Sequence, residues 1–236
     1  MEAVQAVEGP VLLLAVPGSG KTTVLVNRLG YMIYCKGIAP ENILTLTYTV
    51  AATRDMASRF KQLFGDGMSE RMEFRTINGI CAKVIAFYGR LIGKTSFELC
   101  NDDKYTGQLL TNIYLNVERD YPTESDIKAV RTLITYCKNM YLSSEEIKTL
   151  GKENDIDLYR IYEAYNSQLK AQSLMDYDDQ MIYAYKILNG SKATLRHFQE
   201  MYRYICVDAF FHHHVDILII GFSHLKERSL VAVTAH

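Results

Sequence analysis

Short apolar runs alternate with segments of helical periodicity over the first hundred residues. The apolar runs are typical of buried strands, and the segments between them repeat apolar positions every three or four residues, as one face of a helix does. The strands expected are 11–16, 43–49 and 73–76, and the helices are 24–32, 51–64 and 77–88. Because strands and helices alternate, the pattern predicts a parallel sheet covered by helices, which is an α/β fold.

From about residue 101 the strand signals vanish and helical periodicity dominates. Ser143 is followed three residues later by Glu146, which is the capping-box pattern at the start of a helix. One later helix carries an apolar stripe made of Leu158, Ile161, Tyr162, Tyr165 and Leu169. Strand character returns at 202–207, so we predict an α/β domain of residues 1–100 and 201–236 with a helical insertion of residues 101–200.

Three carboxylates lie close together at Asp176, Asp178 and Asp179. A metal cluster is one interpretation of such a group. They also begin a helix, where negative charge is favoured by the helix dipole. The sequence therefore favours a helix cap with structural contacts.

Composition limits the possible classes of protein. The chain has 236 residues, of which 48% are hydrophobic and 22% charged, as in soluble globular proteins. Its net charge is −1, so nucleic-acid binding would need a local site. No apolar run is long enough to span a bilayer, and no signal peptide is visible, so no membrane partner is expected. Five scattered cysteines without a CxxC pair indicate reduced thiols and a cytoplasmic protein.

The segment "AVPGSGKT", followed by Thr23, has the pattern of a phosphate-binding loop. Gly18 and Gly20 let backbone N–H groups curl around a phosphate, and the following helix adds its positive end. Lys21 would reach the β- and γ-phosphates, and the Thr22 hydroxyl would bind Mg²⁺. A glycine-rich turn that binds nothing is the alternative, but the strand before and the helix after favour a nucleotide site. The predicted nucleotide-binding residues are Ala15, Val16, Pro17, Gly18, Ser19, Gly20, Lys21, Thr22 and Thr23.

Four further segments appear downstream in a fixed order. They are "ILTLTYTVAATRDMASRF" (43–60), "FRTINGICAKVI" (74–85), "MDYDDQMIYAYKIL" (175–188) and "YRYICVD" (202–208). With the phosphate loop, they resemble in order and spacing the superfamily 1 helicases of the UvrD/Rep type. The resemblance implies a RecA-like P-loop NTPase fold with a helical insertion, ATP and Mg²⁺ as cofactors, and ATP hydrolysis coupled to 3′-to-5′ movement on single-stranded DNA.

The resemblance also implies DNA-binding residues. Tyr48 would stack on a base of single-stranded DNA, and Thr49, Thr76 and Asn78 would contact phosphate or sugar. Tyr48 could instead be a packed tyrosine at the sheet edge, and Asn78 a helix N-cap. The segment Glu2 to Val4 resembles the tail of the family's adenine-reading motif, but Gln5 is not the glutamine that reads adenine.

The clearest departure from the family follows Asp208. Asp208 stands where the family has the catalytic aspartate that holds Mg²⁺ through water. The next residue is Ala209 instead of the family's glutamate, and loss of a group that orients the attacking water typically costs about 10²–10⁴ in rate. Phe211 and His212 likewise replace the family's glutamine and aspartate.

Residues 212–214 are three adjacent histidines. His212 and His214 share one face of a strand, and a two-histidine metal site with Asp208 or Asp216 is one interpretation. The other interpretation is that residues 209–236 are an altered C-terminus in which 216–222 can still form a strand.

The resemblance predicts the ATP-binding motor domain of a DNA helicase. The family binds ATP between two motor domains, so a second motor domain or a longer native chain is implied, and this chain is not expected to unwind DNA alone. The alternative is a non-catalytic fragment that binds DNA or another partner in response to nucleotide. An unrelated P-loop kinase is disfavoured by the match at 43–56.

Overall fold

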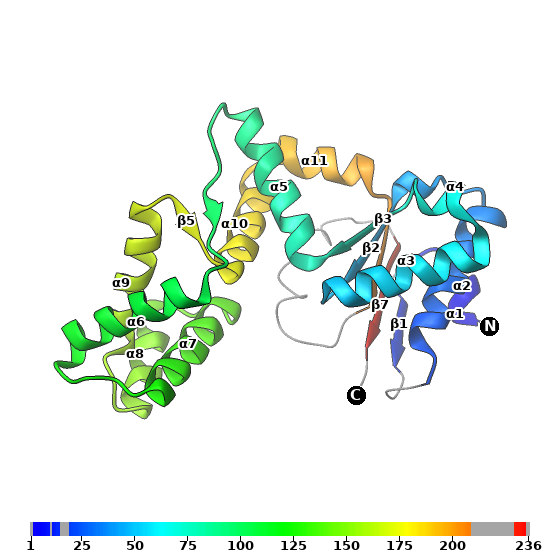
Figure 1. Cartoon of the computed structure of the whole chain (residues 1–236). Helices are drawn as coiled ribbons and strands as arrows, with labels where there is room; N and C mark the ends of the chain where they lie inside the picture. Colours follow the sequence, from blue (N-terminus) through cyan, green and yellow to red (C-terminus); the bar gives the residue numbers. More distant parts are fainter. Residues whose placement is uncertain (1, 10, 15–18, 209–228, 235–236) are drawn as a thin grey trace. The chain divides into compact units, whose positions relative to one another are not determined.

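A five-stranded parallel sheet forms the centre of the unit that comprises residues 1–88 and 184–236 (Figure 1). In spatial order its strands are β1 (Val11–Leu14), β7 (Ser229–Thr234), β6 (Tyr204–Asp208), β2 (Ile43–Thr47) and β3 (Glu73–Thr76). The computed structural model describes residues 2–9, 11–14, 19–208 and 229–234. The predicted α/β fold with a parallel sheet is confirmed.

The strand β7 was not expected from the sequence. The segment 209–236 was interpreted as altered, yet Ser229–Thr234 lies between β1 and β6 and pairs in parallel with both. A buried parallel strand is a short apolar run, and periodicity alone does not distinguish such a run from a buried helix segment, so Ser229–Thr234 gives no decisive local signal. The strand expected at 216–222 lies outside the described residues.

Helices α2 and α3 share one hydrophobic core with the sheet. Among the described residues, the helices that lie wholly within this unit are α1 (Glu2–Gln5), α2 (Lys21–Tyr34), η1 (Pro40–Asn42), α3 (Val50–Phe64), α4 (Asp66–Ser69) and α11 (Lys192–Met201). Leu29 of α2 and Phe60 of α3 are fully buried in this core beside Cys206 of β6. Gly30 allows the close contact between the two helices, because a Cβ there would lie 2.1 Å from the Phe64 ring.

The second unit, residues 89–183, is mainly helical. Its complete helices are α6 (Asp103–Glu118), α7 (Glu124–Asn139), α8 (Ser144–Glu153) and α9 (Leu158–Ala171). Two helices, α5 (Ile77–Leu91) and α10 (Tyr177–Gly190), contain the junctions between the units. The predicted insertion limits, 101–200, stay a prediction. No helix among the described residues is long and apolar enough to cross a membrane.

The predicted helix signals in this unit hold, with one correction. Ser143 and Glu146 form the expected capping box, and the stripe residues Leu158, Ile161 and Leu169 are buried. Strand signals were expected to vanish after residue 101, but β5 (Leu174–Met175) pairs in parallel with β4 (Glu98–Leu99). Two residues are too few to give a periodic signal.

The aspartates at the start of α10 lie around a buried lysine, Lys138. The Lys138 side chain is 0% exposed, and its Nζ lies 2.6 Å from Asp176 and 2.8 Å from Asp179. Asp176 also accepts a hydrogen bond from the backbone N–H of Asp179, as a helix cap does, and Asp178 accepts one from the Thr135 hydroxyl at 2.8 Å. The interpretation of these carboxylates as a cap with structural contacts is confirmed.

Asp178 makes the stability of the fold depend on pH. The pKa of Asp178 is raised from an ordinary value of 3.8 to about 6. Burial is the main cause and the neighbouring Asp176 and Asp179 add to it, while the Thr135 hydrogen bond and Lys138 oppose the rise. The folded chain therefore keeps a proton that the unfolded chain releases. The stability gained from this proton is lost as the pH rises from about 4 to about 6.

We predict that Asp178→Asn stabilises the protein near neutral pH. Asparagine keeps an acceptor for Thr135 and carries no charge, so the free energy of unfolding should exceed that of the wild type by roughly 1–3 kcal/mol at about pH 8. The gain should shrink as the pH falls below about 5, where Asp178 is protonated. Urea unfolding followed by circular dichroism at both pH values measures this, and a difference that does not vary with pH would contradict it.

Candidate functional site

The start of α2 has the backbone geometry that an anion site requires. Gly20 adopts a left-handed conformation (φ 84°, ψ 22°) immediately before the helix, which only glycine adopts without strain. The positive end of the α2 dipole therefore faces the loop that carries Ser19 and Gly20, and both residues are exposed. The predicted phosphate-binding residues Ala15, Val16, Pro17 and Gly18 lie outside the described residues.

A hydrogen bond joins the first turn of α2 to the end of β6. The Thr22 hydroxyl donates to a carboxylate oxygen of Asp208 at 2.9 Å, although 186 positions separate the two residues in the sequence. Both side chains are half-buried, and β6 ends at Asp208. The two residues that the sequence predicts as Mg²⁺ ligands thus lie in direct contact beside Lys21.

The ends of three strands lie in one row at the same edge of the sheet. Thr47, the last residue of β2, pairs with Asp208 of β6 on one side and with Thr76 of β3 on the other. The predicted DNA-binding residues Tyr48 and Thr49 follow Thr47 directly. In parallel sheets the ligand site lies at the carboxyl ends of the strands. The register therefore brings the predicted nucleotide and DNA residues to one sheet edge.

Tyr48 and Thr49 occupy the turn between β2 and α3. Tyr48 is 55% exposed, which disfavours the alternative of a tyrosine packed at the sheet edge. The Thr49 hydroxyl accepts a hydrogen bond from the backbone N–H of Ala52 and so caps α3. A capping hydroxyl still has its own O–H to donate, which a phosphate oxygen can accept.

Thr76 has the same arrangement at the start of α5. Its hydroxyl accepts from the backbone N–H of Gly79 at 3.0 Å, so Thr76 is the residue that caps the helix. The alternative that Asn78 is the N-cap is therefore wrong, because Asn78 lies within the first turn of α5. Its amide oxygen is buried and accepts no hydrogen bond within the described part of the chain.

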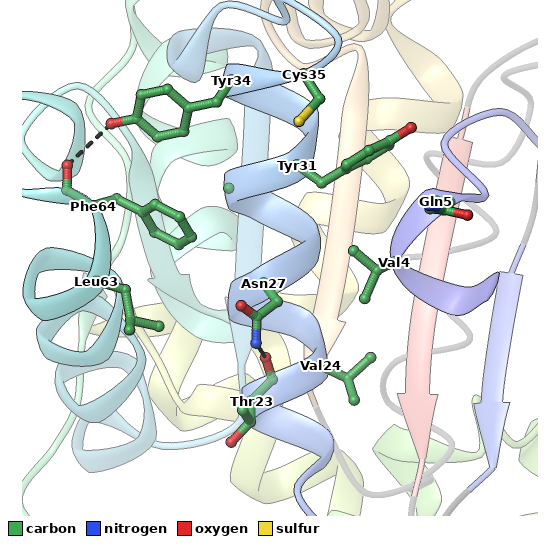
Figure 2. Close-up of a pocket in the computed structure, with 11 residues that line it drawn as sticks. Val4, Gln5, Thr23, Val24, Asn27, Tyr31, Tyr34, Cys35, Leu63 and Phe64 are labelled. Atoms are coloured by element: carbon green, nitrogen blue, oxygen red, sulfur yellow. Dashed lines mark hydrogen bonds between the residues drawn. The ribbon is translucent and has the colours of Figure 1, made fainter. Parts of the chain in front are cut away.

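A cavity of about 760 Å³, which the sequence did not reveal, lies along α2 (Figure 2). Val4 and Gln5 of α1 line one side, and Leu63 and Phe64 at the end of α3 line the other. The α2 residues between them are Thr23, Val24, Asn27, Gly30, Tyr31, Tyr34 and Cys35. These positions recur every three or four residues, so they form a second stripe along α2. This spacing is the sequence signal that could have indicated a second functional face of the helix. Because Thr23 follows Thr22 directly, the cavity adjoins the predicted phosphate site.

The proposed histidine site cannot be placed. His212, His213 and His214, together with Ala209, Phe211 and Asp216, lie outside the described residues. Among the residues that the structure does describe, no group of three or more histidine, cysteine or acidic side chains could hold a metal ion.

Comparisons with known proteins cover nearly the whole chain. Residues 1–211 match the family described as the UvrD/REP helicase N-terminal domain. Over 212 residues, 89% of the chain, it is 30% identical to the ATP-dependent DNA helicase PcrA of Bacillus subtilis and 31% identical to the putative ATP-dependent DNA helicase YjcD of the same organism. It is 24% identical over 210 residues to the ATP-dependent DNA helicase Rep of Buchnera aphidicola. The matched regions span 28% of the two Bacillus proteins and 31% of Rep.

The exposure of Tyr48 generates a prediction about stability. Tyr48→Ala removes a ring that is more than half exposed, so the free energy of unfolding should change by less than about 0.5 kcal/mol. Thermal unfolding beside the buried variant Phe60→Ala, which should lose about 3–5 kcal/mol, measures this. A loss for Tyr48→Ala comparable with that of Phe60→Ala would show that the tyrosine is a packing residue.

Proposed function

The chain belongs to the UvrD/Rep helicase family, as its motifs predict, and from this premise we propose that it is an ATP-binding motor domain acting on single-stranded DNA. The contact between Thr22 and Asp208 carries the proposal. It joins the phosphate loop to the strand end where the family holds its metal. The relatives are named ATP-dependent DNA helicases, and the chain spans less than a third of their length.

The residues at the start of α2 suit a nucleotide with Mg²⁺. The Thr22 hydroxyl and the Asp208 carboxylate offer two oxygen atoms within 2.9 Å of each other, and oxygen is the ligand that Mg²⁺ prefers. Bound there, the ion would neutralise phosphate charge. Lys21 would bind the terminal phosphates, and the segment 15–23 would supply backbone N–H groups.

The neighbouring strand ends suit a strand of DNA. Tyr48 would stack on a base, which is worth about 1–3 kcal/mol and does not depend on sequence. The capping hydroxyls of Thr49 and Thr76 would donate to phosphate oxygens, and the buried amide oxygen of Asn78 could accept from a sugar hydroxyl or a base. By analogy with the UvrD/Rep helicases, the proposed motor would move in the 3′-to-5′ direction, and a second motor domain would complete the ATP site.

A second candidate function is nucleotide-controlled binding without catalysis. The specific observation in its favour is Ala209, which follows Asp208 where the family has the glutamate that orients the attacking water. In that case ATP would bind and alter DNA affinity, while hydrolysis would be slow by about 10²–10⁴.

The experiment measures Mg·ATP affinity and ATP turnover, each with and without single-stranded DNA. We expect Lys21→Ala to weaken Mg·ATP binding at least about tenfold, since it removes a charged hydrogen-bond donor. Tyr48→Ala should weaken DNA binding about 5- to 150-fold without changing Mg·ATP binding in the absence of DNA.

The outcomes separate the candidates. Turnover that DNA stimulates and Lys21→Ala abolishes would identify an active motor domain. Binding without turnover, with DNA and ATP each changing the affinity of the other by the same factor, would identify the non-catalytic function. A wild-type chain that binds neither Mg·ATP nor single-stranded DNA would overturn both.

A further inference from the structure

Arg28 is a buried cation that the proposed nucleotide site does not use. Its side chain is 1% exposed and is among the largest fully buried side chains of the described residues. It lies on α2, six positions after Thr22, and faces the sheet where β6 carries Cys206. Burial lowers the pKa of Arg28, with a smaller opposing effect from the Cys206 thiol.

The contacts of Arg28 are few for a buried charge. Its Nη1 donates to the backbone carbonyl oxygen of Ala3, in α1, at 2.7 Å. Nε and Nη2 are buried and donate to no oxygen or nitrogen acceptor in the part of the chain that the structure describes, and the Cys206 thiol beside the guanidinium is only a weak acceptor. No carboxylate of the described residues forms an ion pair with Arg28 either. A buried charge that is so poorly paired destabilises a fold, and an apolar side chain of similar size often does better.

The one strong contact of Arg28 holds α1 against α2. A helix of four residues has almost no stability of its own, so its position depends on tertiary contacts. Val4 and Gln5 of α1 form one wall of the cavity, across α2 from Leu63 and Phe64 of α3 (Figure 2). The hydrogen bond from Arg28 to Ala3 is therefore one of the contacts that set the position of this wall, beside the packing of α1 on α2.

We propose that Arg28 is a positioning residue for the nucleotide site, which sets α1 so that its side chains meet the nucleoside part of a bound nucleoside triphosphate. The inference rests on the proposed function. With the phosphates at Lys21 and Thr22, the nucleoside would extend toward Thr23, which lines the cavity. Arg28 is too far along α2 and too deeply buried to touch the phosphates. Its effect is confined to the nucleoside end.

The test compares two ligands that share the phosphates and differ in the nucleoside. These are Mg·ATP and Mg·tripolyphosphate, titrated into the full chain by calorimetry. Arg28→Met removes the donors, keeps an unbranched side chain of similar length and relieves the buried charge, so the variant should remain folded. Arg59→Met, which removes one exposed charge from α3, is the matched control.

We expect Arg28→Met to weaken Mg·ATP binding about tenfold and to leave Mg·tripolyphosphate affinity within about twofold of the wild type. Arg28→Lys keeps the positive charge but replaces the planar guanidinium with an ammonium group, so its loss of Mg·ATP affinity should be intermediate. Arg59→Met should change neither affinity. Because Arg28 acts through α1, the losses caused by Arg28→Met and Val4→Ala should be less than additive in the double variant.

Equal losses for both ligands, or no loss for either, would overturn the inference, because Arg28 would then be a structural residue only. If Arg28→Met fails to fold, Arg28→Lys replaces it. The affinities of Arg28→Lys, Val4→Ala and their double variant for the two ligands then decide the same question. A wild-type chain that binds neither ligand would instead overturn the proposed function, and the two failures are thereby distinguishable.

Discussion

The hydrogen bond between Thr22 and Asp208 is the contact on which the candidate site depends. It closes a loop of 186 positions, and the whole helical unit of residues 89–183 lies within that loop. Closing a loop of this length costs conformational entropy, which one hydrogen bond of about 1–3 kcal/mol cannot offset. The contact is possible because β6 pairs with β2 in the sheet and α2 packs in one core with β6.

The register of the parallel sheet explains why unrelated motifs meet. Thr47, Thr76 and Asp208 end their strands in one row, so whatever follows each strand emerges at the same edge. That edge carries Asp208, which contacts Thr22 of α2, the exposed Tyr48 and the capping hydroxyls of Thr49 and Thr76. Threonines that cap helices are fixed by the fold and still have a proton to donate, which suits them to hold a ligand.

Much of this arrangement could be predicted, because its signals are local. The left-handed turn before α2 requires Gly20, and the capping box is recognised from Ser143 and Glu146. The periodicity of apolar residues predicts the alternation of strands and helices. Thr22 and Asp208 were predicted to act together through the family resemblance, since nothing local connects residues so far apart. Their roles toward Mg²⁺ and ATP stay predictions.

What the sequence did not reveal depends on partners that are distant along the chain. β7 is a strand because β1 and β6 lie on either side of it, and the cavity exists because α1 is placed against α2. Arg28 has no distinguishing signal within the helix predicted at 24–32, although its side chain is buried and donates a hydrogen bond to Ala3 of α1. At α5 the sequence suggested Asn78 as the N-cap, but the helix begins at Ile77, so the capping residue is Thr76, which precedes it.

The most direct measurement is a double-mutant cycle on Mg·ATP affinity with Thr22→Val and Asp208→Asn. If the two residues hold one metal-bound nucleotide, each variant weakens binding with Mg²⁺ present, the double variant loses less than the sum by at least about 1 kcal/mol, and the differences vanish when EDTA removes the ion. Additive losses that persist without Mg²⁺ would show that Thr22 and Asp208 are only a structural contact, and the account of the site would be wrong.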